Sequence, residues 1–185
     1  MELISKKIKC EGRFIRMMDL SYKDHRGNLR NWEAVERVNC DGVTVVVPVT
    51  NKGELLLIRQ FRPVLNNYVV EFPAGLNEKD ESPLVAAKRE LIEETGYTAD
   101  DFIKLADGPV SSGMSTETLH VLLAKEVYPA SEKVKALHPP DETENIEIIL
   151  TPFEKAFETI SDYSSRGDLI DLKIYGFVEL AKRYL

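Results

Sequence analysis

The sequence contains little cysteine and no long apolar run. Cys10 and Cys40 are its two cysteines in 185 residues, and their spacing is not that of a metal-ligand pair. We therefore expect two reduced thiols, as in a cytoplasmic protein. No apolar run approaches the ~20 residues that a membrane span requires, and the first stretch, MELISKKIKC, does not resemble a signal peptide. The expected location is the cytoplasm, without a membrane partner.

The chain also has fewer basic than acidic residues. The chain has 24 Lys and Arg against 31 Asp and Glu, which gives a formal net charge of −7. A general nucleic-acid binder presents a basic face to phosphates, so no nucleic-acid partner is expected. A small anionic substrate is compatible with this charge if local arginines or a metal ion receive it. The apolar content of 43% is that of an ordinary globular protein with a real core.

The hydrophobic patterns predict a chain that is rich in strands. Residues 7–38 favour an antiparallel β-meander, with one strand over KIKCEGRFIRMMDLSYKD, a turn at HRGN and a second strand over RNWEAVERV. The β-branched run Gly42–Thr50 predicts a buried strand, and ELLLIRQF after the NKG turn predicts its hairpin partner. Further strands are expected over Asn67–Gly75 and over the segments FIKLADGPV, TLHVLLAKEVY and IEIILTP.

Helices are expected in the middle and at the end of the chain. Ser82 is a suitable N-cap, Pro83 suits the first helical position and Gly96 suits the C′ position. The predicted buried stripe of this helix is Leu84, Ala87, Leu91 and Thr95. Two more helices follow the last strand, and Asp168 is the expected cap of the final one. The fold class is therefore predicted as α+β.

Three glutamates crowd together near the end of the central helix. Glu90, Glu93 and Glu94 have i, i+3 and i, i+4 spacings and project from the surface opposite the apolar stripe. One interpretation is a solvated acidic face, but like charges repel and the helix dipole disfavours anions at this end. A divalent cation would remove both costs. Carboxylate oxygens without His or Cys suit Mg²⁺ or Mn²⁺, and Mg²⁺ points to a phosphate substrate.

The spacing of nine residues around these glutamates is that of a known motif. Gly75, Glu81, Arg89-Glu90-Leu91, Glu93-Glu94 and Gly96-Tyr97 stand at the fixed positions of the Nudix box, so the chain resembles the Nudix hydrolases. The resemblance implies an α/β/α sandwich of mixed sheet, with the box at residues 75–97. It implies that divalent metals are held by Glu90, Glu93, Glu94 and the backbone carbonyl of Ala74. It further implies that Arg89 orients the glutamates and that Glu81 supports them.

The resemblance extends beyond the box, over roughly residues 10–150. The segments NWEAVER, RQFRP and VVEFPAGL are similar to those of ADP-ribose and nucleoside-diphosphate-sugar pyrophosphatases. This similarity implies two parts: an N-terminal meander, residues 1–40, that swaps across a homodimer and binds the base, and a hydrolase domain, residues 41–185. The implied substrate contacts are Phe14 and Trp32 for stacking, Glu33 for the base edge, Arg37 and Arg62 for phosphate or ribose, and Gly113 and Met114 in a loop over the substrate.

Plainer interpretations of these residues stay open. Phe14 and Trp32 could be core residues, and Arg37 and Arg62 could be surface charges. Glu71 falls just before the box and is a candidate outer ligand of the metal or of water. Ser112 stands where many ADP-ribose pyrophosphatases carry proline, which favours a broader preference that includes GDP-mannose.

The implied reaction is attack of water on a diphosphate, giving a nucleoside monophosphate and a sugar phosphate. The general base is expected in the acidic segment HPPDETEN, with Glu144 as the first candidate and Glu142 as the alternative. A solvated linker without chemistry is the plainer interpretation of that segment. Two other functions are compatible with the motif: a Nudix pyrophosphohydrolase of nucleoside triphosphates or capped RNA, and a non-catalytic ADP-ribose sensor.

Overall fold

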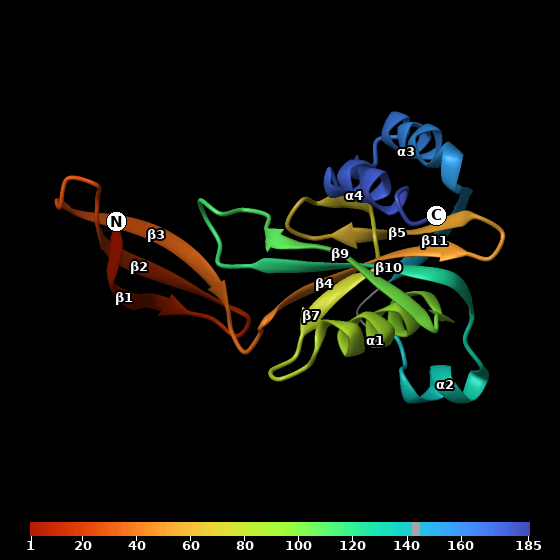
Figure 1. Cartoon of the computed structure of the whole chain (residues 1–185), viewed down its shortest axis with the longest axis horizontal. Helices are drawn as coiled ribbons and strands as arrows, with labels where there is room; N and C mark the ends of the chain where they lie inside the picture. The colour runs from red at the N-terminus through yellow and green to blue at the C-terminus, as the bar shows by residue number, and fades with distance from the viewer. Residues whose placement is uncertain (142–144) are drawn as a thin grey trace.

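The computed structural model describes residues 1–141 and 145–185 and contains two separate sheets (Figure 1). The smaller sheet is an antiparallel meander of β1 (Glu2–Glu11), β2 (Ile15–Lys23) and β3 (Leu29–Arg37), which projects from the body of the molecule. The single strand predicted before HRGN is wrong, because the chain reverses at Gly12, whose N–H donates to the Ile15 carbonyl at 2.8 Å. That reversal divides the segment into β1 and β2.

The body is built on a nine-stranded mixed sheet. Its central order is β12-β6-β5-β4-β10-β8, while β11 pairs with β5, β7 with β4 and β9 with β10. The pairs β10–β4 and β12–β6 are parallel, and the others are antiparallel. The strands are β4 (Gly42–Thr50), β5 (Glu54–Arg62), β6 (Asn67–Glu71), β7 (Ala74–Asn77), β8 (Tyr97–Thr98), β9 (Asp101–Pro109), β10 (Thr118–Pro129), β11 (Ile146–Pro152) and β12 (Leu169–Ile170).

Helices cover both faces of this sheet, which makes the body an α/β/α sandwich (Figure 1). One face carries α1 (Pro83–Thr95), with the short α2 (Glu132–Leu137) near its end. The other face carries α3 (Ala156–Ser165), which follows the 3₁₀ turn η1 (Phe153–Lys155), and α4 (Lys173–Ala181). The α+β class and the Nudix-type sandwich predicted from the sequence are confirmed.

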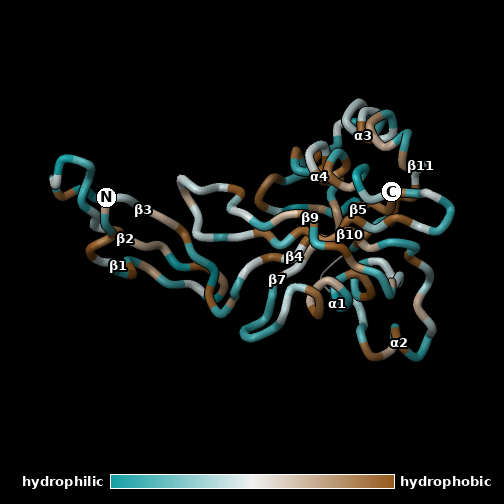
Figure 2. The backbone as a smooth tube through the Cα atoms, viewed as in Figure 1, coloured by the Kyte–Doolittle hydropathy of each residue, from teal (hydrophilic) through white to brown (hydrophobic). Residues whose placement is uncertain are grey.

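Strand β4 explains how the two layers share one sheet. Val46 packs with Ala87 and Leu91 of α1, whereas Val45 and Val47 pack on the side of α3 and α4. Neighbouring strand residues point to opposite faces, so a strand covered on both faces is apolar throughout. The hydropathy colouring in Figure 2 accordingly places hydrophobic residues on the central strands of the body.

Helix α1 begins and ends where its capping residues predict. The Ser82 hydroxyl accepts the Val85 N–H, and Gly96 takes a left-handed conformation with φ of 69°. The predicted buried stripe is wrong at Leu84, which is 44% exposed, because the helix approaches the sheet through the small residues Ala86 and Ala87. The buried face is thus rotated from the prediction, and it takes in Glu90 and Glu94 as well.

The start of α4 also differs from the prediction. Asp168 does not cap this helix but forms an ion pair with Arg59. The helix begins at Lys173, whose backbone N–H donates to the Asp171 carboxylate at 3.0 Å. Among the residues that the structure describes, no helix is long and apolar enough to cross a membrane.

Candidate active site

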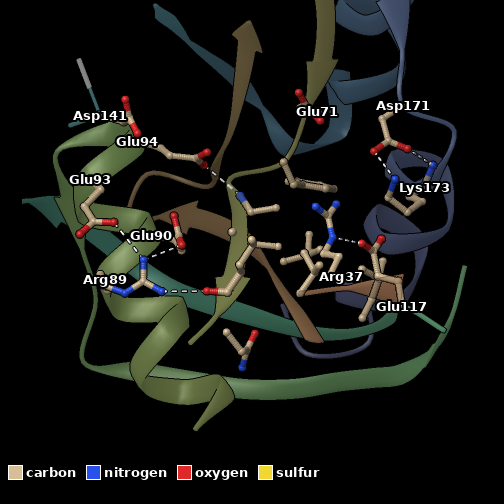
Figure 3. Close-up of a pocket in the computed structure, with 18 of the residues that line it drawn as sticks. Arg37, Glu71, Arg89, Glu90, Glu93, Glu94, Glu117, Asp141, Asp171 and Lys173 are labelled. Atoms are coloured by element: carbon tan, nitrogen blue, oxygen red, sulfur yellow. Dashed lines mark hydrogen bonds and ion pairs between the residues drawn. The ribbon is translucent and has the colours of Figure 1, made fainter. Parts of the chain in front are cut away.

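A cavity of about 580 Å³ opens between α1, β7 and the first turn of α4 (Figure 3). Its described lining includes eight acidic and four basic residues, so its formal charge is about −4. An anionic ligand would be repelled by such a lining unless divalent cations accompanied it. The charged lining residues are Glu71, Glu78, Glu90, Glu93, Glu94, Glu117, Asp141, Asp171, Arg37, Arg62, Arg89 and Lys173.

Two of the predicted metal-binding glutamates are buried against strand β7. Glu94 is 8% exposed and its Oε2 accepts the backbone N–H of Ala74 at 2.9 Å. Glu90 is 9% exposed and lies against Gly75, where an added Cβ would come within 1.8 Å of the Glu90 Oε1. The interpretation of these carboxylates as a solvated acidic face is therefore wrong. Carboxylates are rarely buried without a partner, and here they converge on a cavity.

Arg89 holds the acidic residues of the box together. Its guanidinium donates to Glu90 Oε1 at 2.5 Å and to Glu93 Oε2 at 3.0 Å (Figure 3). The same guanidinium donates to both oxygens of Glu81, at 2.8 and 3.1 Å. It also donates to the Leu76 carbonyl at 3.0 Å. The Glu81 hydrogen bonds raise the pKa of Arg89, and in return Arg89 lowers the pKa of Glu81. Arg89 and Glu81 are therefore both charged at neutral pH.

As oxygen donors, these carboxylates suit a hard divalent cation, but in this structure they are not arranged around a single point. Within residues 1–141 and 145–185, no three His, Cys, Asp or Glu side chains form a ready metal-binding group. Arg89 accounts for part of this, because its guanidinium lies between Glu90 and Glu93 and draws both toward itself. Oxygen donors and a strongly negative cavity are what a cation such as Mg²⁺ requires.

The wall opposite the glutamates carries three pairs of opposite charge. Arg37 pairs with Glu117, and the Lys173 ammonium lies 2.5 Å from Asp171 (Figure 3). Arg62 donates to Glu71 at 2.8 Å. Both predicted arginines thus reach the cavity, as does Glu71. Sequence reasoning missed Glu117, Asp171, Lys173 and Asn39, which also line the cavity. The one available signal was the position of Glu117 just after the predicted loop over the substrate.

The predicted stacking residues lie apart from this cavity. The Trp32 indole N–H donates to the Gly113 carbonyl at 2.9 Å, and the Val35 N–H donates to the Met114 carbonyl at 2.8 Å. Strand β3 is therefore fastened to the β9–β10 loop, which brings together Trp32, Gly113 and Met114. None of these residues is among the described residues that line the cavity.

The predicted base-binding residues of the meander, Phe14, Trp32 and Glu33, are exposed. Trp32 is 50% exposed and Phe14 is 64% exposed, so the interpretation of either as a core residue is wrong. The Arg13 guanidinium lies 4.9 Å from the Phe14 ring centroid, and Glu33 pairs with Lys9 at 2.7 Å. Phe14 and Trp32 thus present exposed rings, but within one chain neither lines the cavity that holds the glutamates.

The two candidate bases fall where the chain is not described. Glu142 and Glu144 lie outside the described residues, so their roles stay predictions. Asp141, the residue directly before them, does line the cavity.

Comparisons with known proteins agree with this geometry. Residues 40–171 match the family model for the NUDIX domain. An ADP-ribose pyrophosphatase of Bacillus subtilis (strain 168) is 37% identical over 147 residues, covering 78% of this chain and 76% of the relative. An ADP-sugar pyrophosphatase of Mus musculus is 30% identical over 182 residues, covering 94% and 84%. A GDP-mannose pyrophosphatase of Escherichia coli (strain K12 / DH10B) is 34% identical over 148 residues, covering 77% and 74%.

Comparison with a solved structure supports the fold through structural similarity alone. The crystal structure of an ADP compounds hydrolase superposes with a TM-score of 0.80 at 21% identity, covering 99% of this chain and 92% of that one. The family match spans most of the chain and includes each element that lines the acidic side of the cavity. Nudix hydrolases generally use divalent metal ions, in keeping with the carboxylates at the cavity. The protein belongs to the Nudix family of hydrolases.

Proposed function

We propose that this protein hydrolyses the diphosphate bond of ADP-ribose or related nucleoside diphosphate sugars in a Mg²⁺-dependent reaction. The products are a nucleoside monophosphate and a sugar phosphate. The observation that carries the proposal is one cavity with box glutamates on one side and Arg37 and Lys173 on the other, and with Arg62 also in its lining. The names of the similar proteins, which include ADP-ribose, ADP-sugar and GDP-mannose pyrophosphatases, support this substrate class.

The metal would be held by Glu90, Glu93, Glu94 and the backbone carbonyl of Ala74. When bound, Mg²⁺ or Mn²⁺ supplies charge neutralisation at the diphosphate and a lower pKa for bound water. The close fit of Glu90 to Gly75 and the bond from Ala74 to Glu94 support this assignment, because they aim the carboxylates at strand β7. Arg89 has the accompanying role of holding Glu90 and Glu93 in place.

The cationic wall would bind the rest of the diphosphate. Arginine offers forked hydrogen bonds to phosphate oxygens, and both Arg37 and Arg62 already lie at the cavity wall. Their carboxylate partners, Glu117 and Glu71, restrict the orientation of each guanidinium before a ligand arrives. Glu71 keeps its predicted role as an outer ligand of the metal or of water. Glu144, with Glu142 as the alternative, is the proposed general base.

We further propose that residues 1–40 act as a separate dimerisation and base-binding part beside a hydrolase domain of residues 41–185. All ten residues of β1 are exposed, and an exposed apolar face of this kind marks an interaction surface. In a swapped homodimer, Phe14, Trp32 and Glu33 would contact the base, and Gly113 and Met114 would lie over the substrate. The exposed apolar residues of the meander are Leu3, Ile4, Ile8, Phe14, Ile15, Met17, Leu29 and Trp32.

The cellular setting follows from composition. We propose a cytoplasmic location, because both cysteines are free thiols. The negative net charge argues against a nucleic-acid partner.

Product analysis tests the proposal directly. The purified protein is incubated with Mg²⁺ and, separately, ADP-ribose, GDP-mannose and dGTP, and products are resolved by ion-exchange chromatography. AMP and ribose 5-phosphate are expected from ADP-ribose, and none should form with excess EDTA. The GDP-mannose rate measures how broad the specificity is, which bears on Ser112 at the usual proline position.

Other products would contradict the proposal. Pyrophosphate from dGTP with the sugar nucleotides intact would move the protein to the triphosphate-hydrolysing branch. Binding of ADP-ribose without turnover of any substrate would identify a sensor.

A further inference from the structure

Part of the cavity wall opposite α1 is built by a segment that lies at and just beyond the end of the family match. Lys173, Ile174 and Phe177 of α4 line the cavity, whereas the match ends at residue 171. Figure 3 shows Lys173 and Asp171 across the cavity from Glu93 and Glu94. The shape of this side of the cavity therefore depends on how the chain before α4 is fastened to the sheet.

Backbone contacts fasten that chain to strand β6. Leu169 and Ile170 form the short parallel strand β12 against Val69 and Val70, and the Asp171 N–H donates to the Val70 carbonyl at 3.0 Å. The Asn67 side-chain amide donates to the Gly167 carbonyl at 3.0 Å. A two-residue strand is a weak attachment by itself, because it provides few ladder hydrogen bonds.

One arginine adds a side-chain attachment at the same place. Arg59 of β5 forms a bidentate pair with Asp168, with Nε to Oδ2 at 2.7 Å and Nη2 to Oδ1 at 3.0 Å. Its guanidinium also lies 3.8 Å from the Tyr68 ring centroid and donates to Glu147 at 3.2 Å. The Asp168 side chain is only 10% exposed and that of Arg59 is 22% exposed. A partly buried bidentate pair holds its geometry far better than a solvated surface pair.

Arg59 does not itself line the cavity. It follows Leu55 and Leu57 on the face of β5 that packs against α3 and α4, whereas Arg62, three residues later, projects from the other face and lines the cavity. Strand β5 thus holds a cavity residue on one face and the anchor of the cavity wall on the other.

We propose that Arg59 is a positioning residue for substrate binding, which fixes the α4 wall of the cavity through Asp168. The inference rests on the proposed function and deepens it. Through this wall Arg59 determines the positions of Lys173 and Phe177. It therefore affects the binding of the half of the substrate that lies away from the glutamates. Helix α1 packs mainly on β4, β7 and β8 and less on β10 and β11, so we expect loss of Arg59 to leave Glu90, Glu93 and Glu94 in place.

The kinetic test compares full-length Arg59→Met and Arg59→Lys with wild type, using ADP-ribose and Mg²⁺. We expect KM to rise on the order of tenfold in Arg59→Met, while kcat and the Mg²⁺ concentration for half-maximal activity change less than about twofold. Arg59→Lys should recover part of the loss, because it keeps the charge without the fork. Arg166→Met is the matched control, since Arg166 lies two residues before Asp168 and its guanidinium stands 5.3 Å from the Tyr163 ring centroid.

Hydrogen exchange gives a readout that does not depend on turnover. Amides of residues 169–177 should exchange faster in Arg59→Met, while those of residues 86–95 keep wild-type rates. Asp168→Asn, which keeps the side-chain shape, should reproduce both results if Arg59→Met does not fold. An unchanged KM in Arg59→Met with an active wild type overturns the inference about Arg59 alone, as does an equal KM rise in Arg166→Met. A wild type that hydrolyses neither ADP-ribose nor GDP-mannose overturns the proposed function, and the inference about Arg59 falls with it.

Discussion

The meander and the body are both rich in strands, but they bury their side chains to very different extents. Every residue of β4 in the body is buried, whereas every residue of β1 in the meander is exposed. Among the meander's own residues, Met18 and Ala34 are the buried apolar side chains. Ion pairs on its surface, such as Lys6–Glu36 and Lys9–Glu33, contribute little because water screens them. The body is thus stabilised by its own core, and the meander needs a further surface.

The meander and the body also differ in the candidate functional residues that they carry. The body carries the glutamates and most of the cavity lining. The meander adds Arg37 to that lining, carries the exposed aromatic rings and is fastened to the body through the β9–β10 loop. Changes in the body should therefore alter turnover and folding. Changes in the meander should alter substrate affinity and assembly.

The largest effect is expected in the body. Glu94→Gln should lower kcat by more than about 100-fold, because it removes a proposed metal ligand rather than an outer partner. Thermal unfolding should change little, since the amide can still accept the Ala74 N–H. Steady-state kinetics at saturating Mg²⁺ measure this. A Glu94→Gln variant with wild-type kcat would remove Glu94 from the metal site.

The next prediction compares two aliphatic strand residues. Leu57→Ala in the fully buried core should lower the free energy of unfolding by about 2–5 kcal/mol. Ile8→Ala on β1, where Ile8 is 47% exposed, should cost less than about 0.5 kcal/mol in dilute protein. Urea unfolding measures both. If the meander lies in a homodimer interface, the Ile8→Ala cost should grow with protein concentration.

A smaller effect is expected at the meander's tryptophan. Trp32→Ala should raise KM for ADP-ribose about tenfold, since stacking on a base contributes roughly 1–3 kcal/mol. Trp32→Phe is the matched control, because it keeps a stacking ring and loses only the bond to Gly113. Equal KM values for Trp32→Ala and wild type would indicate that the substrate is bound by residues of the body and not by Trp32.

An effect of similar size concerns acid stability in the body. Hydrogen bonds from Arg89 lower the pKa of Glu81 below its ordinary value of 4.5. The stabilisation from Glu81 is therefore complete above pH 4.5 and is lost as pH falls through the lowered pKa. Glu81→Gln should cost about 1–2 kcal/mol at pH 7 and should flatten stability below pH 4.5, as acid unfolding curves would show. A curve parallel to wild type below pH 4.5 would contradict this assignment.

The sequence predicts where the helices and strands lie better than it predicts which of their residues are buried. Local signals located the β4–β5 hairpin and both ends of α1, because turn residues, Ser82 and Gly96 act through the nearby backbone. Periodicity could not show which face of α1 meets the sheet. Leu84 was therefore misplaced, and the burial of Glu90 and Glu94 was not foreseen.

The candidate site divides in the same way. The glutamates and Arg89 share one helix and follow a fixed spacing, so the sequence alone brought them together. Glu117 and Lys173 reach the cavity only through the pairing of distant strands, which no local pattern encodes. Asp168 was misassigned for the same reason, because its partner Arg59 is 109 positions away.

The contact between Gly75 and Glu90 has a consequence for how this chain tolerates mutation. Every other residue carries a Cβ, and a Cβ at position 75 would overlap the Glu90 carboxylate. In a saturation library selected for activity, position 75 should lose alanine as completely as tryptophan, whereas core positions such as Leu57 should rank replacements by size. The backbone at Gly75 is therefore part of the site, because the Glu90 carboxylate occupies the space that a side chain at position 75 would need.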